Sequence, residues 1–228
     1  MKHLVVLTGA GISAESGIKT FRDADGLWEG HDVMKVATPE GFAKNPELVL
    51  NFYNQRRKQL LTVKPNEAHK ALAALENTYK VTIITQNVDD LHERAESSNI
   101  IHLHGELLKA RSSKNEQDIK AWKTDIQLGD LCEQGHQLRP HIVWFGEAVP
   151  MIEKAIEVCE TADILVIIGT SMQVYPAASL MDFVPSQTPI YYIDPKPARV
   201  DNQKITVIPK SATEGVKSLL DFLKSHNN

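Results

Sequence analysis

The chain has 228 residues, a formal net charge of −4 at pH 7, 42% hydrophobic and 24% charged residues, which exclude a disordered, fibrous or membrane-embedded protein. Its basic residues are dispersed and no stretch could span a bilayer, so neither a nucleic acid nor a membrane is expected as a partner. The length suits one large α/β domain with an inserted smaller lobe, and the distant cysteines Cys132 and Cys159 argue against a disulfide framework and for the cytoplasm.

Short apolar runs alternate with helical patterns along the chain. Runs typical of strands buried on both faces occur at residues 3–7, 81–85, 163–168 and 189–193, and residues 204–208 are a fifth strand candidate. Helices are predicted between them at residues 46–61, 66–77, 151–159 and 212–224. This alternation predicts a doubly wound, Rossmann-like parallel sheet with helices on both faces.

Two stretches interrupt the alternation and are predicted to form the smaller lobe. Residues from about 24 to 79 have helical patterns without an obvious strand, and residues from about 108 to 138 are polar and irregular. The large lobe then takes residues 1–23, 80–107 and 139–228. No internal repeat divides the chain, so residues 1–228 are interpreted as one domain.

The first predicted strand runs directly into a glycine-rich turn. Gly9-Ala10-Gly11-Ile12-Ser13-Ala14 has the G-x-G-x-x-G/A spacing of dinucleotide-binding turns, in which glycines let the backbone approach a pyrophosphate. The same spacing also occurs in tight turns whose glycines serve packing alone. The usual acidic residue that closes a second strand and binds ribose is missing. Phe21, Arg22 and Trp28 follow instead and could fold over a cofactor, so an atypical dinucleotide site is predicted.

Polar residues follow two other predicted strands at their carboxyl ends, where ligands bind in open α/β sheets. Gln86-Asn87-Val88-Asp89 follows one strand and Gly169-Thr170-Ser171 follows another. Their amide, carboxylate, backbone and hydroxyl groups can bind ribose hydroxyls and phosphates. Asp89 and Ser171 are also common helix-capping residues, and capping and ligand binding can coexist.

A histidine pair closes a further short apolar segment, His102-Leu103-His104-Gly105. If the segment is a strand, its alternation places His102 and His104 on one side. Histidine suits the role of general base because its ordinary pKa is near neutrality. Most of the nine histidines are nevertheless expected to be plain surface or hydrogen-bonded residues, and position alone does not select His104.

His104 is selected by a resemblance to a known family, which several motifs indicate together. Gly9-Ala10-Gly11-Ile12-Ser13, Thr20-Phe21-Arg22, Thr85-Gln86-Asn87-Val88-Asp89 and His102-Leu103-His104-Gly105 follow one another as they do in sirtuins. The order continues through Arg139-Pro140-His141-Ile142-Val143-Trp144-Phe145-Gly146-Glu147, Gly169-Thr170-Ser171 and Val174-Tyr175-Pro176-Ala177. Each motif alone is weak, but the ordered set is highly specific. The chain therefore resembles the sirtuin family over nearly its whole length.

The resemblance implies a single catalytic domain with NAD-dependent protein-lysine deacylase activity. NAD is then consumed as a co-substrate, His104 deprotonates a ribose hydroxyl, and nicotinamide, O-acyl-ADP-ribose and free lysine are the products. Asn87, with Gln86 and Asp89, is implied to orient nicotinamide and ribose, so that Asn87 is catalytic together with His104. The remaining implied NAD contacts are Gly9, Ala10, Gly11, Ser13, Gly169, Thr170 and Ser171 at the phosphates, Phe21, Arg22 and Trp28 over the site, and Asp194 and Ala212 at the adenosine.

The substrate peptide is assigned by the same resemblance. The segment 142–147 resembles the strand that pairs with an extended peptide, a case of β-augmentation. Its implied substrate contacts are Val143, Phe145, Gly146 and Glu147. Without the family context, this apolar run would be interpreted as a core strand.

The acyl pocket is expected at Tyr53 and Arg56, which are three residues apart on one face of the predicted helix 46–61. They match the Tyr-x-x-Arg of class III sirtuins, in which a phenol and a guanidinium bind the distal carboxylate of a succinyl, malonyl or glutaryl group. The structural alternative is a core aromatic residue beside a surface charge.

The chain departs from the family between His104 and Arg139, where most relatives have two cysteine pairs that bind a structural zinc. Here the interval holds Cys132 alone, and a closed tetrahedral site needs four good ligands. We therefore expect no zinc. An apolar stripe is predicted to stabilise the lobe instead, formed by Ile119, Trp122, Ile126, Leu128 and Leu131, with helical spacing at least from Ile119 to Ile126.

Two other functions use the same predicted features. A protein mono-ADP-ribosyltransferase would let a protein nucleophile attack the activated ribose, but Tyr53 and Arg56 favour acyl-lysine. A non-catalytic NAD-binding module is disfavoured by His104, Gln86 and Asn87. Acylated lysine peptides are thus the expected partners, and the chain is expected to be a monomer.

Overall fold

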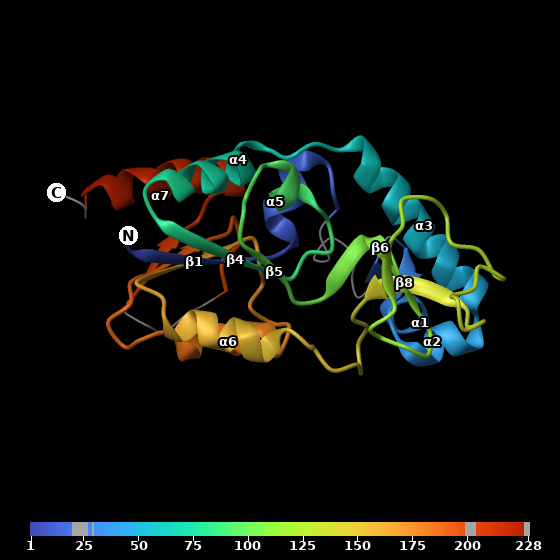
Figure 1. Cartoon of the computed structure of the whole chain (residues 1–228). Helices are drawn as coiled ribbons and strands as arrows, with labels where there is room; N and C mark the ends of the chain where they lie inside the picture. Colours follow the sequence, from blue (N-terminus) through green and yellow to red (C-terminus); the bar gives the residue numbers. More distant parts are fainter. Residues whose placement is uncertain (20–26, 29, 199–203, 226–228) are drawn as a thin grey trace.

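A computed structural model describes residues 1–19, 27–28, 30–198 and 204–225. They form two lobes that lie side by side (Figure 1). The larger lobe surrounds a parallel sheet, and the smaller one combines short helices with an antiparallel sheet. The predicted fold class is confirmed. No helix in these described ranges is long and apolar enough to cross a membrane.

The described part of the larger lobe contains a parallel sheet with the strand order β11-β10-β9-β1-β4-β5. Its strands are β1 (His3–Thr8), β4 (Lys80–Thr85), β5 (Ile100–His102), β9 (Ile164–Ile168), β10 (Ile190–Ile193) and β11 (Ile205–Ile208). The five predicted strands correspond to β1, β4, β9, β10 and β11. The chain proceeds outward from β1 in both directions, so a crevice opens at the carboxyl ends of the central strands.

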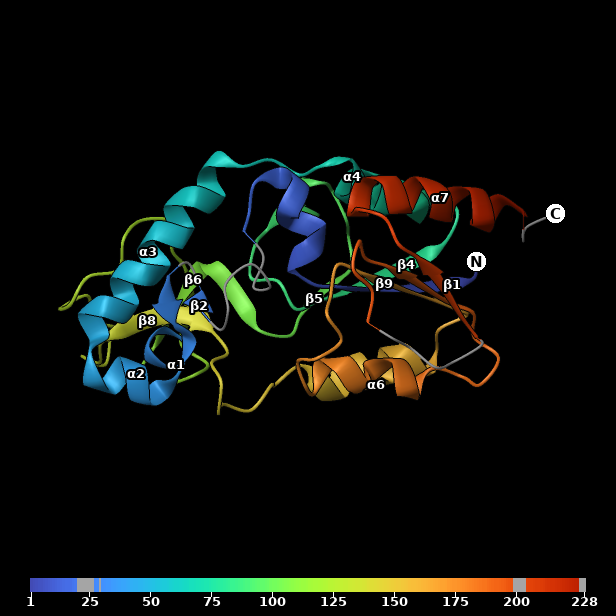
Figure 2. The same cartoon turned by 180° about the vertical axis from the view of Figure 1, so that it is seen from behind.

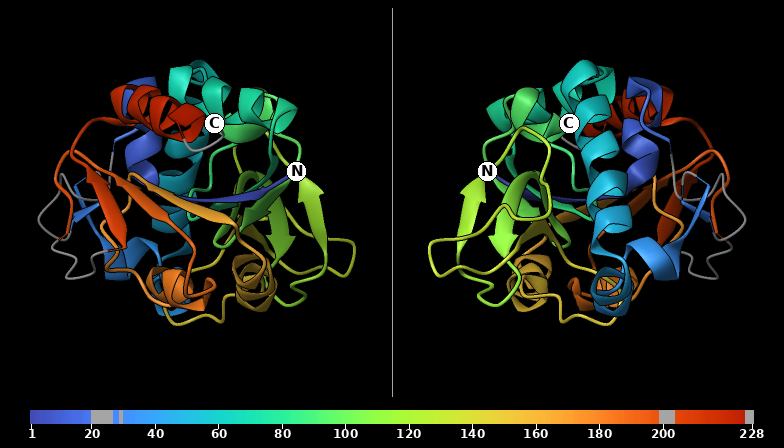
Figure 3. Two further views of the ribbon diagram at one scale, coloured as in Figure 1. Left: turned by 90° about the vertical axis from the view of Figure 1, so that its left-hand side faces the viewer. Right: turned by 90° about the vertical axis from the view of Figure 1, so that its right-hand side faces the viewer.

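Both faces of this sheet are buried beneath helices. Leu4 and Val6 contact the layer of α4 (Glu67–Ala74) and α7 (Ala212–Ser225). Val5 and Leu7 contact the opposite layer, which contains α6 (Ile152–Glu160) and the 3-10 helix η4 (Ala177–Phe183). Figures 1 and 2 show these layers above and below the sheet, and Figure 3 shows them from the two ends. Because both faces pack, the central strands β10, β9, β1 and β4 are buried along almost their whole length. The edge strand β11 is exposed at Thr206 and Val207.

The smaller lobe combines short helices with two small sheets. Its elements are β2 (Leu27–Trp28), β3 (His31–Asp32), α1 (Val33–Val36), α2 (Pro39–Lys44), α3 (Pro46–Thr62), β6 (Gly105–Ser112), β7 (Ile119–Ala121) and β8 (Leu138–Ile142). Strands β7, β6 and β8 form an antiparallel sheet in that order. Helix α3 packs against it, and together they form a core that includes Phe52, Tyr53, Leu107 and Trp144.

Helix α3 carries the predicted acyl pocket, and local sequence signals define its ends. Asn45 precedes it, and its side chain accepts a hydrogen bond from the Leu48 N–H at 3.1 Å, while Pro46 occupies the first turn. The helix ends at Thr62, shortly before Lys64-Pro65, since the residue before a proline disfavours helical backbone.

The lobe boundaries differ from the predicted ones. Helix α4 and the 3-10 helix η3 (Leu75–Asn77) pack on the large sheet, because Leu72 and Tyr79 share a core with Leu4. The predicted small-lobe range 24–79 is therefore wrong at its end. The small sheet also extends past the predicted range 108–138, because Gly105 pairs with Ile142.

The predicted apolar stripe of the small lobe is also wrong. Ile119, Leu128 and Leu131 are 42%, 47% and 52% exposed, because this segment forms strand β7 and turns instead of a helix. Ile126 alone of the five is fully buried, and Trp122 is partly buried. The Asn54 side chain on α3 holds the segment, since it donates to the Ile126 carbonyl and accepts from the Ile126 N–H, both at 2.9 Å.

The two cysteines lie in different hydrophobic cores, both as free thiols. Cys132 is buried in the small lobe, where its thiol lies 3.5 Å from the Ser112 hydroxyl. Cys159 lies on α6 in the large-lobe core. The chain therefore has no four-cysteine set from which a zinc site of the usual kind could form.

Candidate active site

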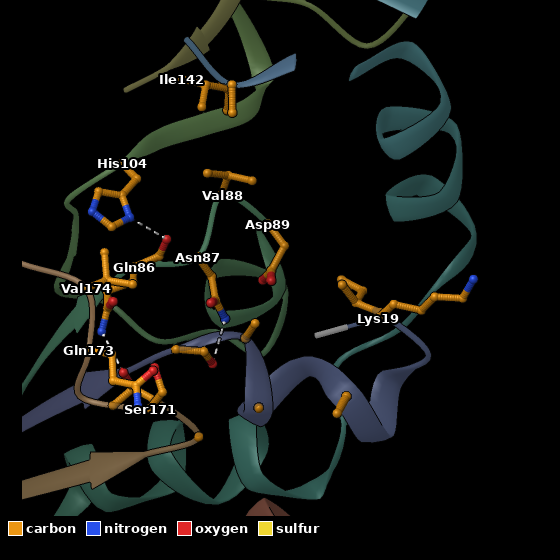
Figure 4. A pocket seen from close by; sticks show the side chains of 18 of the residues that line it. Lys19, Gln86, Asn87, Val88, Asp89, His104, Ile142, Ser171, Gln173 and Val174 are labelled. Carbon is orange, nitrogen blue, oxygen red and sulfur yellow. Dashed lines mark hydrogen bonds between the residues drawn. The ribbon is translucent and has the colours of Figure 1, made fainter. Parts of the chain in front are cut away.

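A cavity of about 920 Å³ lies between the lobes at the carboxyl ends of the parallel strands. The residues that follow β1, β4, β9 and β10 line one side, and α3 with the segment after β8 lines the other. Figure 4 shows His104, Gln86 and Asn87 converging on this space from neighbouring loops. The cavity is lined by all the predicted site residues that the structure describes, except Ser13 and Trp28.

The glycines after β1 pack directly against the loop after β9. A Cβ on Gly11 would lie 2.5 Å from the Cα of Gly169, and one on Gly9 would lie 2.8 Å from the Gly169 oxygen. Gly169 itself has a φ of +64°, which favours glycine. The packing interpretation of the glycine spacing is therefore correct for these two loops. This packing does not exclude the cofactor-binding interpretation, because the backbone of the same glycines forms the cavity wall.

Asn87 and Asp89 are joined to the first turn through Ser13, which lies in the 3-10 helix η1 (Ala10–Ser16). The Asn87 amide donates to the Gly9 carbonyl and to the Ser13 hydroxyl, both at 3.2 Å. Ser13 in turn donates to Asp89 at 2.9 Å. These bonds fix the Asn87 side chain at the base of the cavity.

Burial raises the pKa of Asp89 to about 6, and hydrogen bonds from the Leu91 N–H and the Ser13 hydroxyl oppose that shift. The bond from Leu91, at 3.1 Å, holds the N–H of the first residue of α5 (Leu91–Arg94), but the N-cap position of that helix is Asp90 and no side chain caps it there. Asp89 also lines the cavity, so the bond to Leu91 does not prevent a role in ligand binding.

The loops after β4 and β9 are joined by a side-chain hydrogen bond. The Gln86 amide donates to the Thr170 hydroxyl at 3.1 Å, and Ser171 lines the cavity beside it. Asp194, which follows β10, is buried and accepts from the Lys196 N–H at 2.8 Å. Ala212 begins α7 at the same end of the cavity wall.

His104 has the hydrogen bonding of a neutral general base. Its Nδ1 lies 3.0 Å from the Gln86 carbonyl oxygen. A carbonyl can only accept, so Nδ1 carries the proton and Nε2 is the unprotonated nitrogen. Burial lowers the pKa of His104, and the bond to Gln86 only partly offsets this effect. The ring is therefore neutral at pH 7 and can take up a proton at Nε2.

His102 does not share a strand with His104, because β5 ends at His102. Its Nδ1 lies 3.2 Å from the Asn87 carbonyl and its Nε2 lies 2.6 Å from Glu93. Burial alone would lower the pKa of His102, but the bond and charge of Glu93 raise it above its ordinary value. His102 is thus an ion-pairing residue behind the cavity, unlike His104.

Tyr53 and Arg56 lie on the same face of α3, as predicted, and both line the cavity. Tyr53 is fully buried and Arg56 is half-buried. The Arg56 guanidinium carbon lies 4.6 Å from the centroid of the Phe52 ring. Arg56 is therefore not the surface charge of the structural alternative, because it extends along the wall of the cavity.

The predicted strand at 142–147 is wrong beyond its first residue, because β8 ends at Ile142 and the following residues form a turn. Val143 donates to the His104 carbonyl, and Phe145 donates to the Ala37 carbonyl, both at 2.9 Å. Phe145 is 45% exposed. The Glu147 carboxylate accepts hydrogen bonds from Arg139, Arg111 and the Trp144 N–H.

Some predicted residues fall outside what the structure describes, and others were missed. Phe21 and Arg22 lie outside the described residues, and only the backbone of Trp28 is described, within β2. The cavity is also lined by Val88, Leu107 and Ile142, which sequence reasoning did not select. Val88 lies inside the motif 86–89 and Ile142 inside the segment 142–147, so these motifs could have indicated a place at the cavity, whereas Leu107 had no such signal.

A doubly wound parallel sheet whose crevice opens onto a histidine-containing cavity defines a dinucleotide-binding α/β protein. The model of the Sir2 family matches residues 9–176. The chain therefore belongs to the Sir2 family, the sirtuins.

Curated relatives and solved structures agree with this assignment. An NAD-dependent protein deacylase of Helicobacter pylori is 61% identical over 224 residues, which are 98% of each chain. One of Bacteroides thetaiotaomicron is 57% identical over 230 residues, again 98% of each. Among solved structures, a Sir2 homologue in complex with NAD has a TM-score of 0.86 and 39% identity, and the alignment covers 100% of this chain and 91% of that one.

Proposed function

We propose that this protein is a NAD-dependent protein-lysine deacylase that releases nicotinamide and O-acyl-ADP-ribose. The observation that carries the proposal is His104, a neutral imidazole on the cavity with its proton on Nδ1 and its basic nitrogen at Nε2. Full-length relatives named as NAD-dependent protein deacylases support the activity.

The described residues fit NAD. The cavity is of the size of small-molecule sites, which are about 300–1,000 Å³, and close packing of the glycine loops brings backbone rather than side chains to its wall. We assign the phosphates to Gly9, Ala10, Gly11, Gly169, Thr170 and Ser171, the nicotinamide and its ribose to Gln86, Asn87 and Asp89, and the adenosine to Asp194 and Ala212. Ser13, predicted as a further phosphate contact, does not line the cavity and instead holds Asn87 and Asp89. When bound, NAD supplies a ribose–nicotinamide bond whose cleavage opens the ribose to attack by the acyl-lysine amide oxygen.

The catalytic roles follow from the hydrogen bonds already described. His104 accepts a proton from a ribose hydroxyl at Nε2, which its lowered pKa keeps unprotonated at pH 7. Asn87 is held by Gly9 and Ser13, so its amide is fixed before a ligand binds. Such prior positioning reduces the entropy lost when the reacting groups are aligned.

The acyl pocket is proposed to prefer succinyl and malonyl groups, in addition to accepting acetyl. Tyr53 and Arg56 place a phenol and a guanidinium on one wall of the cavity. A guanidinium binds a carboxylate through paired, charge-assisted hydrogen bonds. Acetyl-lysine lacks the distal carboxylate and gains nothing from that pair.

The substrate peptide is proposed to lie along Val143, Phe145, Gly146 and Glu147, of which Phe145 and Gly146 are exposed. A Sir2 structure with a p53 peptide and NAD, 29% identical with a TM-score of 0.80 and aligned over 96% of this chain, supports peptide binding at this fold. We further propose a monomer in the cytoplasm, where the free thiols of Cys132 and Cys159 stay reduced.

The activity is tested by mass spectrometry of acetyl, succinyl and malonyl peptides incubated with NAD. We expect nicotinamide release that depends on the acyl peptide and is lost in His104→Ala. Nicotinamide release with ADP-ribose on protein would indicate a mono-ADP-ribosyltransferase instead. NAD binding without any turnover would indicate a non-catalytic module.

The acid-acyl preference is tested with Arg56→Met. Loss of hydrogen bonds to a charged group predicts a decrease in desuccinylation of roughly tenfold to a hundredfold, and a much smaller effect on deacetylation. Lys58→Met, at an exposed position on the same helix, is the matched control. Equal loss of activity on the succinyl and acetyl substrates would show that Arg56 does not bind the distal carboxylate.

A further inference from the structure

Trp144 lines the same cavity as Tyr53 and Arg56, and its indole is held from several sides. The Arg139 guanidinium carbon lies 3.2 Å from the centroid of its ring. Glu147 accepts from the Trp144 backbone N–H at 2.8 Å and from Arg139 at 2.6 Å. Arg111 adds bonds to Glu147 at 3.1 and 3.2 Å. The indole therefore has little freedom to move.

This indole donates a hydrogen bond to the Tyr53 hydroxyl, with 2.9 Å between Trp144 Nε1 and the phenol oxygen. Both side chains are buried, at 2% and 0% exposure. An indole nitrogen can only donate, whereas a phenol can both accept and donate. Tyr53 is therefore the acceptor in this bond, and the bond does not use the hydroxyl proton.

The direction of this bond matters for a carboxylate. A carboxylate accepts hydrogen bonds and cannot donate them when ionised, so a tyrosine that recognises one must present its proton. A buried hydroxyl that accepts from one side is restricted in how it rotates about its C–O bond. The indole thus turns the Tyr53 hydroxyl proton away from Trp144 and leaves it for another acceptor.

We propose that Trp144 is a positioning residue for acid-acyl specificity, which orients the Tyr53 hydroxyl so that it donates to the carboxylate bound by Arg56. The inference rests on the proposed deacylase function and names a specificity residue of the same site. Arg139 and Glu147 support it by fixing the ring and the backbone of Trp144. An acetyl group lacks the carboxylate, so its removal does not depend on this orientation.

The test is a double-mutant cycle read as a selectivity ratio, kcat/KM for a succinyl peptide divided by kcat/KM for the matching acetyl peptide. Trp144→Phe keeps an aromatic ring beneath Arg139 and removes the indole N–H. We expect the ratio to fall roughly fivefold, as for loss of one neutral hydrogen bond. In the Tyr53→Phe background, Trp144→Phe should change the ratio no further, because the hydroxyl is already absent.

Two outcomes would overturn the role of Trp144 without affecting the proposed deacylase function. One is an unchanged ratio in Trp144→Phe, with both activities lowered equally or neither affected. The other is the same fivefold fall with and without the Tyr53 hydroxyl, since Trp144 would then act by another route. If the wild-type enzyme removes acetyl but not succinyl groups, the proposed acid-acyl preference fails as well, so the two failures are distinguishable.

A second measurement needs no change at Trp144, in case Trp144→Phe does not fold. In a ¹H–¹⁵N spectrum of wild-type protein labelled at tryptophan, Tyr53→Phe identifies the Trp144 indole resonance among the three tryptophans. We expect a succinyl peptide to shift that resonance more than an acetyl peptide does. Equal shifts with both peptides at saturation would overturn the proposal.

Discussion

The Glu147→Gln variant separates two roles of a residue that the sequence assigns to substrate binding. In the structure its carboxylate accepts from Arg139 at 2.6 and 3.1 Å and from Arg111 at 3.1 and 3.2 Å. The side chains of Arg111, Arg139 and Glu147 are only 4%, 7% and 15% exposed. The substitution therefore leaves two buried guanidinium groups side by side without a counter-charge.

The expected cost in unfolding free energy follows from this burial. Removal of one partner from a buried ion pair costs about 3–5 kcal/mol, because the remaining charge is not compensated. Glutamine keeps one acceptor oxygen, and a neutral hydrogen bond contributes about 1 kcal/mol. We therefore expect a loss of about 3 kcal/mol, which for a chain of this size lowers Tm by roughly 6–12 °C.

The assay is equilibrium denaturation in urea, with Glu67→Gln as the control. Glu67 pairs with Lys70 where the two side chains are 71% and 57% exposed, so its loss should cost less than about 1 kcal/mol. If Glu147→Gln unfolds like Glu67→Gln while the KM for peptide rises, the carboxylate serves the substrate and the structural reasoning is refuted.

The pH dependence gives an independent check on Glu147. Burial by itself raises its pKa, but hydrogen bonds from Arg139 and the Trp144 N–H, with the nearby positive charges, bring the pKa below its ordinary value. The stabilisation is therefore complete above the unfolded pKa of about 4.3 and is lost as pH falls through the lower folded value. The stability difference between wild type and Glu147→Gln should shrink below that pH.

Three further predictions concern other parts of the molecule. Burial lowers the pKa of His69 from its ordinary 6.5 to about 4. Protonation therefore favours the unfolded chain, and the free energy of unfolding should fall by about 3 kcal/mol as pH drops from 6.5 to 4. Urea titrations at several pH values should show a smaller fall for His69→Gln than for wild type. Gly11→Ala brings a Cβ to 2.5 Å from Gly169, so we expect a loss of about 1–3 kcal/mol and weaker NAD binding by calorimetry. Elemental analysis of chelator-washed protein should find much less than one zinc per chain, and near-stoichiometric zinc would contradict this expectation.

The extent to which the fold could be predicted depended on how local each signal was. Strands β1, β4, β9 and β10 were predictable, because a strand buried on both faces is largely apolar, whereas the edge strand β11 is exposed at Thr206 and Val207. Helix α3 was predictable from Asn45-Pro46 at its start and Lys64-Pro65 after its end. The lobe boundary near α4 was not, because a helical pattern does not show which of two cores the helix covers.

The candidate site divides in the same way. His104, Gln86 and Asn87 were selected through the ordered motifs, and the structure brings them to one cavity. The bonds of Glu147 to Arg139 and Arg111, and of Trp144 to Tyr53, carried no sequence signal. They join the turn after β8 to residues of α3, β6 and β8, and the closeness of these segments depends on packing of the whole small lobe.

The sequence by itself determined the alternation of buried strands and helices and the ordered motifs of a sirtuin, since both depend on residue types at short, regular spacing. Only the tertiary structure decided that the glycines of the first turn pack against Gly169, that His104 carries its proton on Nδ1, and that Arg56 lines the cavity. These features depend on contacts between segments far apart in the chain, in which a burial or a hydrogen bond exists only once both partners are in place.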